Sequence, residues 1–412
     1  MKTIIFSVII VVLASTMYVL KPMYDRVSFI GNLFTGAEQY ENFNRIKELM
    51  PVTTMKASNK PFEFAKSQAI TLPEVFQYQG NNINSEAFLA QTDTSAFLVI
   101  HQGKVRFERY SLTGGRKVNW LSMSVAKSFI ASAIGVAVED GLIDIQKPIT
   151  DYVPTLIGSA YDNVRVKDVL QMSSGAAWRE DYTDTESDVL RLGNVMATGG
   201  SMDEFIAQMK REYEPGTVSR YNSGDTQALG MLLAAATNRT ITNYIQEKLW
   251  TPLGMESDAY WMVDDHNMEM AFGGLNATAR DYAKLGELYR LKGNWQGKQI
   301  LPAKWIEDAT TSDAPHLMPY AKQPHTTETS PLGYGYQWWL PDSTEGEYSA
   351  IGVYNQFIYV NPVRDLVIVK LSAFSDYSLE NKEEYFKEIE TIEFFRAISK
   401  QFKTNQMPEK QE

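Results

Sequence analysis

The sequence predicts an α+β fold in which one antiparallel sheet is flanked by terminal helices and a helical region is inserted between its strands. Three observations support this prediction: strand patterns toward both ends of the chain, helical patterns between them, and an amphipathic helix near the C-terminus. A chain of 412 residues is long enough for one large unit of this kind. We expect the active site in the cleft where the helical region meets the sheet.

The first strands form a predicted β-hairpin. Residues 96–101 and 104–110 are rich in β-branched and aromatic side chains, and Gln102-Gly103 between them is typical of a two-residue turn. Residues 124–139 follow and are apolar on nearly every face of a helix, which Gly141 ends. A helix of this kind belongs in the core.

Helical periodicity dominates the middle of the chain, and strand periodicity returns after it. The expected helices are residues 165–171, 202–211, 226–236, 242–249 and 279–291. The expected later strands are residues 337–340, 355–360 and 366–372, and an amphipathic helix follows at 383–401. Strands from both ends of the chain therefore complete one sheet.

The N-terminus carries the pattern of an export signal. Met1-Lys2 precedes an apolar run over residues 4–20, which Lys21 closes, so residues 1–21 are expected to be either an uncleaved membrane anchor or a signal peptide cleaved near residues 14–16. Both interpretations place the remaining chain outside the cytoplasm, in the periplasm or another extracytoplasmic space. A buried helix of a cytosolic protein is disfavoured because the run has no charge and no polar stripe.

Two further segments follow this signal. Residues 22–90 show no clear periodicity and are expected to connect the N-terminus to the main domain, which spans residues 91–405.

The composition excludes several classes of partner and cofactor. A formal net charge of -11 argues against a nucleic-acid partner, because binding phosphates requires a basic surface. Cysteine is absent, which excludes disulfides and a thiol nucleophile. The four histidines lack the spacing of metal ligands and no glycine-rich phosphate loop follows a strand, so neither a metal nor another cofactor is expected.

A candidate nucleophile and base stand at Ser124 and Lys127, the one place where lysine follows serine by three residues. Side chains three apart share a helix face, with Cβ atoms about 5–6 Å apart, so the amine can reach the hydroxyl. Burial would lower the lysine pKa from about 10.4 toward neutrality, which lets the neutral amine accept the serine proton. The bare pattern also arises by chance, and a structural role is the alternative.

The surrounding residues resemble a known family. The sequence Ser-Met-Ser-Val-Ala-Lys at 122–127, preceded by Trp120-Leu121, is similar to the nucleophile motif of β-lactamase-like serine hydrolases. These include class C β-lactamases, D-alanyl-D-alanine peptidases, family VIII carboxylesterases and aminohexanoate-oligomer hydrolases. Further landmarks follow in family order at residues 168–175, 214–230, 249–255 and 273–286. The resemblance, over about residues 95–395, implies a β-lactamase/transpeptidase-like fold and an acyl-enzyme on Ser124.

The family's second motif, Tyr-x-Asn or Tyr-x-Ser, has two literal matches. Residues 161–163 lie in a polar loop where the family has no catalytic tyrosine. Residues 221–223 follow Pro215-Gly216 and precede an apolar helix, as in the family. The resemblance therefore implies that Tyr221 lies beside Lys127, whose ammonium would favour the tyrosine phenolate, and hands a proton to the leaving group. Ser223 of the same motif is a candidate substrate contact.

The family's third motif, Lys-Thr-Gly on a strand lining the cleft, is absent. By position Ala350-Ile351-Gly352 takes its place, a form similar to the esterase and amide-hydrolase branches. The resemblance implies that Gly352 lets the backbone approach the substrate and that the Val353 N–H is an oxyanion donor beside that of Ser124. Because the motif lysine helps to hold the β-lactam carboxylate, its loss argues against a true β-lactamase.

Aromatic residues supply the remaining site candidates. Residues 178–182 resemble a loop of the aminohexanoate-oligomer hydrolases, which makes Tyr182 a candidate substrate contact, although a surface tyrosine is equally compatible with the pattern. Five further aromatic residues could line an apolar pocket, although aromatics in such strands more often belong to the core. They are Tyr334, Tyr336, Trp338, Trp339 and Tyr354.

The expected function is that of a carboxylesterase or small-amide hydrolase acting on a small-molecule ester or amide. Two alternatives within the enzyme class are a peptidoglycan-peptide hydrolase and a β-lactamase. A third alternative is a membrane-tethered, non-hydrolytic binding protein of the same fold, because a fold alone does not establish activity.

Overall fold

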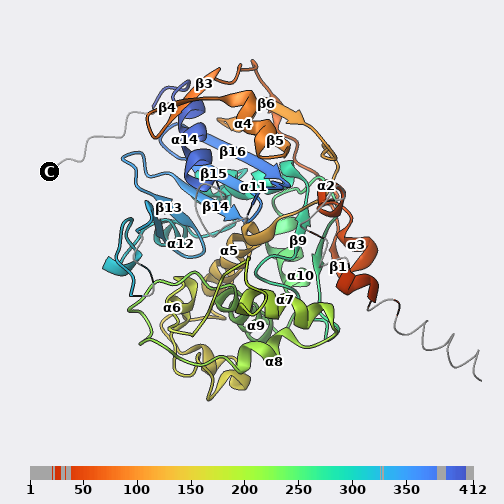
Figure 1. Cartoon of the computed structure of the whole chain (residues 1–412), viewed down its shortest axis with the longest axis vertical. Helices are drawn as coiled ribbons and strands as arrows, with labels where there is room; N and C mark the ends of the chain where they lie inside the picture. Colours follow the sequence, from red (N-terminus) through yellow and green to blue (C-terminus); the bar gives the residue numbers. More distant parts are fainter. Residues whose placement is uncertain are drawn as a thin grey trace, which may run out of the picture.

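The computed structural model describes residues 39–324, 326, 329–377 and 387–404, together with residues 21, 24–28 and 33. An eight-stranded sheet crosses the molecule, and a region of helices lies below it in the view of Figure 1. The strands, in spatial order, are β12 (Leu332–Tyr334), β13 (Trp339–Pro341), β14 (Tyr348–Gly352), β15 (Gln356–Asn361), β16 (Leu366–Ser372), β5 (Thr94–His101), β6 (Lys104–Tyr110) and β2 (Ala65–Lys66). Every pairing is antiparallel except that of β2 with β6.

The predicted hairpin and the joining of the two chain ends are confirmed. β5 and β6 meet at Gln102 and Gly103, whose φ angles of 51° and 70° are the left-handed values that a two-residue hairpin turn requires. On its other edge β5 pairs with β16, so strands from the two ends of the domain lie side by side. Residues more than 250 positions apart in the chain, such as Leu98 and Val369, are therefore paired in this sheet.

Alternation along the strands divides the core in two. On β5, Phe97 and Val99 belong to one cluster while Leu98 and Ile100 belong to the other, because successive side chains point to opposite faces of a sheet. The first cluster includes Phe394 of α14 (Glu388–Ser399), which covers that face. The second includes α11 (Ala279–Arg290) and α5 (Ala126–Glu139). The predicted helix 383–401 corresponds to α14, and its residues 383–386 lie outside the described residues.

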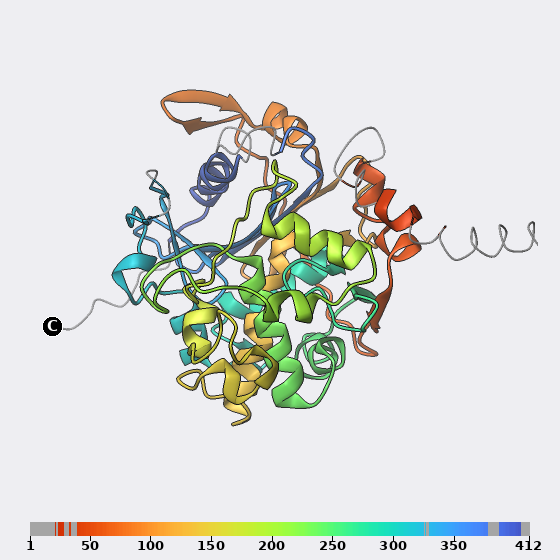
Figure 2. The ribbon, with the colours of Figure 1, turned by 60° about the horizontal axis from the view of Figure 1, so that its bottom comes forward.

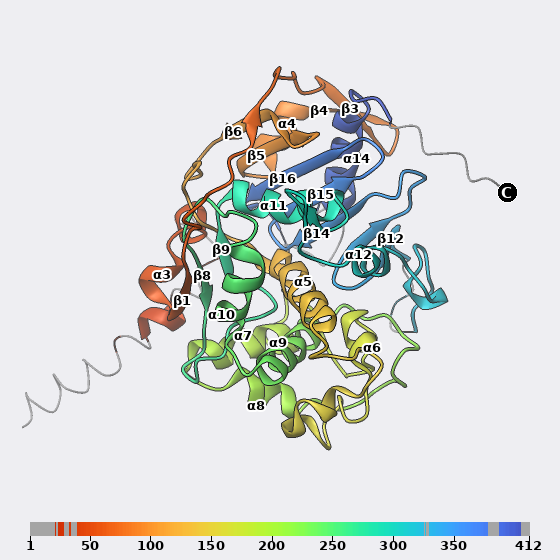
Figure 3. The ribbon, with the colours of Figure 1, turned by 180° about the vertical axis from the view of Figure 1, so that it is seen from behind.

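The inserted helical region comes forward in Figure 2. Its helices are α6 (Val166–Leu170), α7 (Asp188–Ala197), α8 (Met202–Ala207), α9 (Ser223–Thr237), α10 (Ile241–Ile245) and η4 (Gln246–Trp250), with short turns η2 (Ile149–Asp151) and η3 (Pro154–Leu156). The predicted helix 202–211 ends early, at Ala207. Helix α5 lies between this region and the sheet in Figures 1 and 3, and all its residues from Ala126 to Ala137 are buried.

A second, four-stranded sheet was not anticipated. It has the order β1 (Val52–Met55), β8 (Ala259–Met262), β9 (Leu275–Ala277) and β7 (Trp120–Leu121). Residues before position 91, expected only to connect, also form α2 (Gln39–Asn42), α3 (Ile46–Leu49), β3 (Val75–Tyr78), β4 (Asn81–Asn84) and α4 (Ser85–Gln91). This small sheet matters for the site because β7 leads directly into the residues before Ser124.

The remaining elements lie between α11 and β12 in the chain. They are β10 (Asn294–Trp295), β11 (Lys298–Gln299), α12 (Ala303–Ala309) and η5 (Pro315–Leu317). The expected anchor or signal peptide, residues 1–21, lies outside the described residues except for Lys21, so it stays a prediction. Among the described helices, none combines the length and the apolar character needed to cross a membrane.

Candidate active site

Ser124 is held at the junction between the small sheet and α5. Strand β7 pairs with β9, the Ser122 N–H donates to the Leu275 carbonyl at 2.8 Å, and the chain then turns through η1 (Met123–Val125) into the helix. Met123 has φ 47°, a left-handed value that costs a residue with a side chain about 1–3 kcal/mol. Such strain is often found at functional sites, and here it lies in the residue directly before Ser124.

Lys127 lies one helical turn further on and is 1% exposed. Its Nζ is 2.9 Å from Ser124 Oγ, 3.1 Å from Ser223 Oγ and 2.8 Å from the Phe272 carbonyl oxygen. Burial lowers the pKa of this amine to about 7, and the negative charge of Glu180 opposes part of that effect. The amine is therefore in contact with the hydroxyl and available in its neutral form near pH 7.

Tyr221 and Ser223 reach the same point from the start of α9. The Asn222 side chain caps this helix by accepting from the Asp225 N–H at 3.2 Å, which fixes the residues on either side of it. The Lys127 Nζ lies 5.2 Å from the centroid of the Tyr221 ring. The structure thus brings the predicted Ser124, Lys127, Tyr221 and Ser223 together.

The expectation that Tyr221 is a phenolate is wrong. Burial, followed by the negative charge of Glu180, raises the pKa of the Tyr221 hydroxyl well above its ordinary value near 10, although the neighbouring Ser124 hydroxyl acts in the opposite direction. The phenol therefore stays protonated, and Lys127 rather than Tyr221 is the group whose neutral form can take a proton. Tyr221 is a hydroxyl that can pass a proton on.

Strand β14 brings Gly352 against the backbone of Ser124. A methyl group at position 352 would lie 2.7 Å from the Ser122 carbonyl oxygen and 3.0 Å from the Ser124 nitrogen, so only glycine allows this approach. Val353 follows in the turn to β15. Neither the Ser124 N–H nor the Val353 N–H donates a hydrogen bond to another described residue, which leaves both available to an oxyanion.

The loop at residues 178–182 also contributes to the site. Tyr182 donates to Glu180 at 2.6 Å rather than extending into solvent, and Ser223 Oγ donates to the same carboxylate at 2.7 Å. Glu180 was missed in the sequence. Trp178 and Tyr182 each stand two residues from Glu180, and both donate to its carboxylate. This spacing of two is the signal that could have found it.

The aromatic candidates divide between site and core. Trp339 stacks on Tyr221 with ring centroids 5.1 Å apart, and Tyr334 packs on Trp339 at 4.9 Å. Trp338 and Tyr336 are buried against other core aromatics. Trp339 is partly exposed and extends an aromatic surface from the site.

Two other sequence candidates serve the framework. The rejected Tyr161 is buried, and its hydroxyl donates to Asp225 at 3.0 Å in the first turn of α9. Tyr354, in the turn after Val353, packs on Tyr377 with ring centroids 5.1 Å apart. Both support elements that carry site residues.

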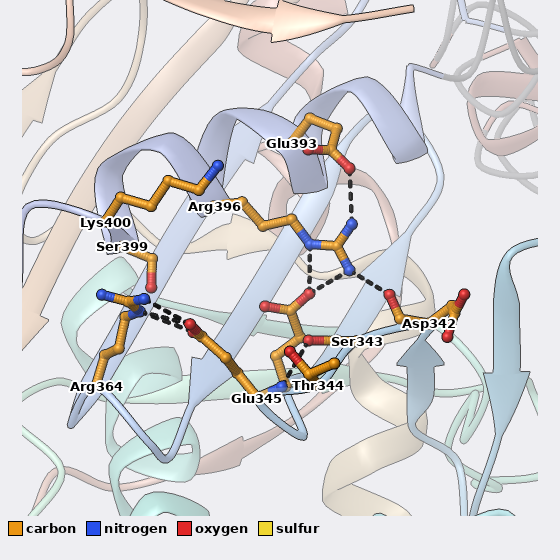
Figure 4. Close-up of a pocket in the computed structure, with 10 residues that line it drawn as sticks. Asp342, Ser343, Thr344, Glu345, Arg364, Glu393, Arg396, Ser399 and Lys400 are labelled. Carbon is orange, nitrogen blue, oxygen red and sulfur yellow. Dashed lines mark hydrogen bonds and ion pairs between the residues drawn. The ribbon is translucent and has the colours of Figure 1, made fainter. Parts of the chain in front are cut away.

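A separate hollow beside α14 is lined mostly by charged residues (Figure 4). Arg364 pairs with Glu345, and Arg396 pairs with Glu347 and Glu393, so these charges satisfy one another. Within the described part of the chain, no group of three acidic or histidine side chains could hold a metal ion. The residues that line the hollow therefore form ion pairs that hold α14 against the sheet. The candidate catalytic side chains lie elsewhere, around Ser124.

Comparison with known proteins agrees with this geometry. The sequence model of the beta-lactamase family matches residues 86–386, most of the chain. The chain belongs to the beta-lactamase family. The 6-aminohexanoate-dimer hydrolase of Paenarthrobacter ureafaciens is 29% identical over 346 residues, which cover 81% of this chain and 85% of the relative. This beta-lactamase-family protein is thus a hydrolase of the serine type, acting on amide or ester bonds.

Solved structures share the fold of this beta-lactamase-family chain. The structure of a provisionally assigned 6-aminohexanoate-dimer hydrolase from Bacillus anthracis superposes with a TM-score of 0.80 at 24% identity, covering 90% of this chain and 96% of that one. EstCE1, a hydrolase with promiscuous acyltransferase activity, superposes with a TM-score of 0.60 at 16% identity, covering 76% and 96%. The predicted α+β fold with its inserted helical region is confirmed.

Proposed function

We infer that Ser124 is the nucleophile and Lys127 its base in the hydrolysis of small esters or linear amides. The contact that carries this inference is the 2.9 Å separation of Lys127 Nζ from Ser124 Oγ, made by a buried amine whose pKa is lowered to about 7. A neutral amine in this position takes the serine proton as the oxygen attacks, which is the usual way that a serine is activated.

The reaction proceeds in two halves. The Ser124 Oγ–H proton passes to Lys127 while Oγ bonds to the carbonyl carbon. The C–N or C–O bond then breaks, and the Lys127 ammonium returns the proton to the leaving group, with the neutral Tyr221 hydroxyl as the relay. Water next loses a proton to Lys127, attacks the acyl-enzyme and releases the carboxylic acid, and the proton returns to Ser124.

The backbone supplies the oxyanion site. The N–H groups of Ser124 and Val353 are uncommitted among the described residues, and the close approach of Gly352 to the Ser124 nitrogen brings the two together. Donors that are already in place before the charge develops contribute about 3–4 kcal/mol each to such reactions.

Three observations favour a linear amide or ester over a β-lactam. The relative that matches four fifths of the chain is named for hydrolysis of the 6-aminohexanoate dimer. No lysine stands at the position of the Lys-Thr-Gly motif, where the family holds the β-lactam carboxylate, since Ala350 occupies it. The aromatic surface of Tyr221, Trp339 and Tyr334 suits a slender apolar chain.

The test is a parallel assay of the full-length chain and Ser124→Ala on p-nitrophenyl butyrate, the 6-aminohexanoate dimer and a chromogenic cephalosporin. We expect the wild type to turn over the ester and the amide and to leave the cephalosporin nearly untouched, with Ser124→Ala inactive on all three. Efficient turnover of the cephalosporin would replace this substrate class with a β-lactam. Equal activity of the two proteins would remove Ser124 from the mechanism.

A further inference from the structure

Four hydrogen bonds converge on the carboxylate of Glu180. Ser223 donates to it twice, from Oγ to Oε1 at 2.7 Å and from its backbone N–H to Oε2 at 3.0 Å. The Tyr182 hydroxyl donates to Oε1 at 2.6 Å, and the Trp178 indole N–H donates to Oε2. A carboxylate bound on both oxygens by groups from two separate segments has a single orientation, so its charge is fixed in place.

One hydroxyl separates this carboxylate from the candidate base. Lys127 Nζ donates to Ser223 Oγ at 3.1 Å, and Ser223 Oγ donates to Glu180. An ammonium can only donate and a carboxylate can only accept, so the direction of this chain from Lys127 to Glu180 is determined when both are ionised. Ser223 therefore links Lys127 and Glu180, and its role as a substrate contact stays a prediction.

We propose that Glu180 is a positioning residue for proton transfer: it orients Ser223 toward Lys127, and its negative charge balances the ammonium formed when Lys127 takes the Ser124 proton. This role rests on the proposed function of Ser124 and Lys127. The ammonium would otherwise form on a side chain that is 1% exposed, and the oxygens of described residues within 3.1 Å of Lys127 Nζ are all neutral. The negative charge of Glu180, which the Ser223 hydroxyl separates from Lys127, lowers the free energy of this buried ammonium.

The effect of Glu180 on the groups around it gives the sign of the expected pKa change. Its charge raises the pKa of groups on every segment packed against it: Lys127 on α5, Tyr182 of its own loop, Tyr221 and Asp225 at the start of α9, and Tyr334 on β12. Glu388 acts on Tyr221 as well. Because Lys127 must be neutral to act, removal of the Glu180 charge lowers the pKa of the base and moves the acid limb of the rate profile to lower pH.

The experiment compares kcat/KM from pH 5 to 9 for the full-length wild type, Glu180→Gln and Glu180→Asp, using p-nitrophenyl butyrate. Glu180→Gln keeps the size and an accepting oxygen but removes the charge. We expect its acid limb to lie about one pH unit below that of the wild type and its plateau to fall about 10-fold or more. Glu180→Asp keeps the charge, so we expect its acid limb to stay near that of the wild type.

Two further variants separate the alternatives. Ser223→Ala breaks the hydrogen-bonded link but leaves the charge, so its plateau should fall while its limb moves less than that of Glu180→Gln. Glu186→Gln, at an exposed carboxylate of the same loop, is the matched control and should behave as the wild type. An unshifted limb in a folded Glu180→Gln, or the same shift in Glu180→Gln and Glu180→Asp, overturns the proposal. Turnover of p-nitrophenyl butyrate by Ser124→Ala at the rate of the wild type defeats the proposed function instead.

Discussion

Replacement of Lys127 by methionine should abolish activity and make the protein more stable at neutral pH. The lysine pKa falls from an ordinary value near 10.5 to about 7 because the side chain is buried. At pH 7 this difference costs the folded state about 4 kcal/mol relative to a neutral side chain, at about 1.4 kcal/mol per pH unit. The methionine side chain would leave the Phe272 carbonyl without its donor, which costs about 1–3 kcal/mol, while Ser223 keeps its hydrogen bond to Glu180. The net gain in unfolding free energy is about 1–3 kcal/mol.

The pH dependence of this gain has a definite sign. The pKa of Lys127 is lower in the folded state than in the unfolded chain, so between about pH 7 and 10.5 the unfolded chain binds the proton more strongly. Wild-type stability therefore rises with pH across this window, relative to the variant. By pH 9.5 the cost of burying the lysine falls to about 1–1.5 kcal/mol, and the advantage of Lys127→Met shrinks by about 3 kcal/mol.

Urea denaturation at pH 7 and at pH 9.5 measures both quantities. Lys60→Met, at an exposed lysine, controls for the general effect of exchanging the two side chains. The reasoning is refuted if Lys127→Met is less stable than the wild type at pH 7, or if the difference between them changes by less than about 1 kcal/mol between the two pH values. Either result would mean that burial does not drive the lysine toward its neutral form.

Three further substitutions test other parts of the site. Gly352→Ala places a methyl group 2.7 Å from the Ser122 carbonyl oxygen, so we expect kcat to fall about 100-fold or more in steady-state assays as the oxyanion site is displaced. Tyr221→Phe should lower amide turnover about 100-fold or more but that of p-nitrophenyl esters far less, because nitrophenolate leaves without a proton; equal losses would contradict the relay. Lys370→Met removes the 2.6 Å hydrogen bond to Asn355, in the turn after Gly352, and should slow acylation about 10-fold. It should not lower the melting temperature, because burial holds the pKa of Lys370 well below its ordinary value and the loss of this buried amine offsets the loss of its hydrogen bonds.

The structural features that the sequence predicts are those that depend on local patterns of residues. The hairpin at Gln102-Gly103 has a turn with its own residue preference, and the helix after Ser124 has an apolar surface over its full length. The contact of Ser124 with Lys127 follows from helical spacing alone. Each of these depends on residues close together in the chain.

The parts that the sequence did not predict depend on distant residues. Strands β7 and β9 have two and three residues, too few to show a period, and they are stabilised by pairing with each other. The protonated state of Tyr221 reflects burial and the charge of Glu180, which lies on another segment. Residues 178–182 contain two acidic side chains, and which of them turns inward depends on the donors of Ser223.

The most direct test of the central claim is intact-mass spectrometry of the wild type and Ser124→Ala after exposure to a fluorophosphonate probe. We expect one adduct on the wild type and none on Ser124→Ala, because only an activated serine attacks the phosphorus. An adduct of equal yield on both proteins, or no adduct on a folded wild type, would contradict the assignment of Ser124 as the nucleophile.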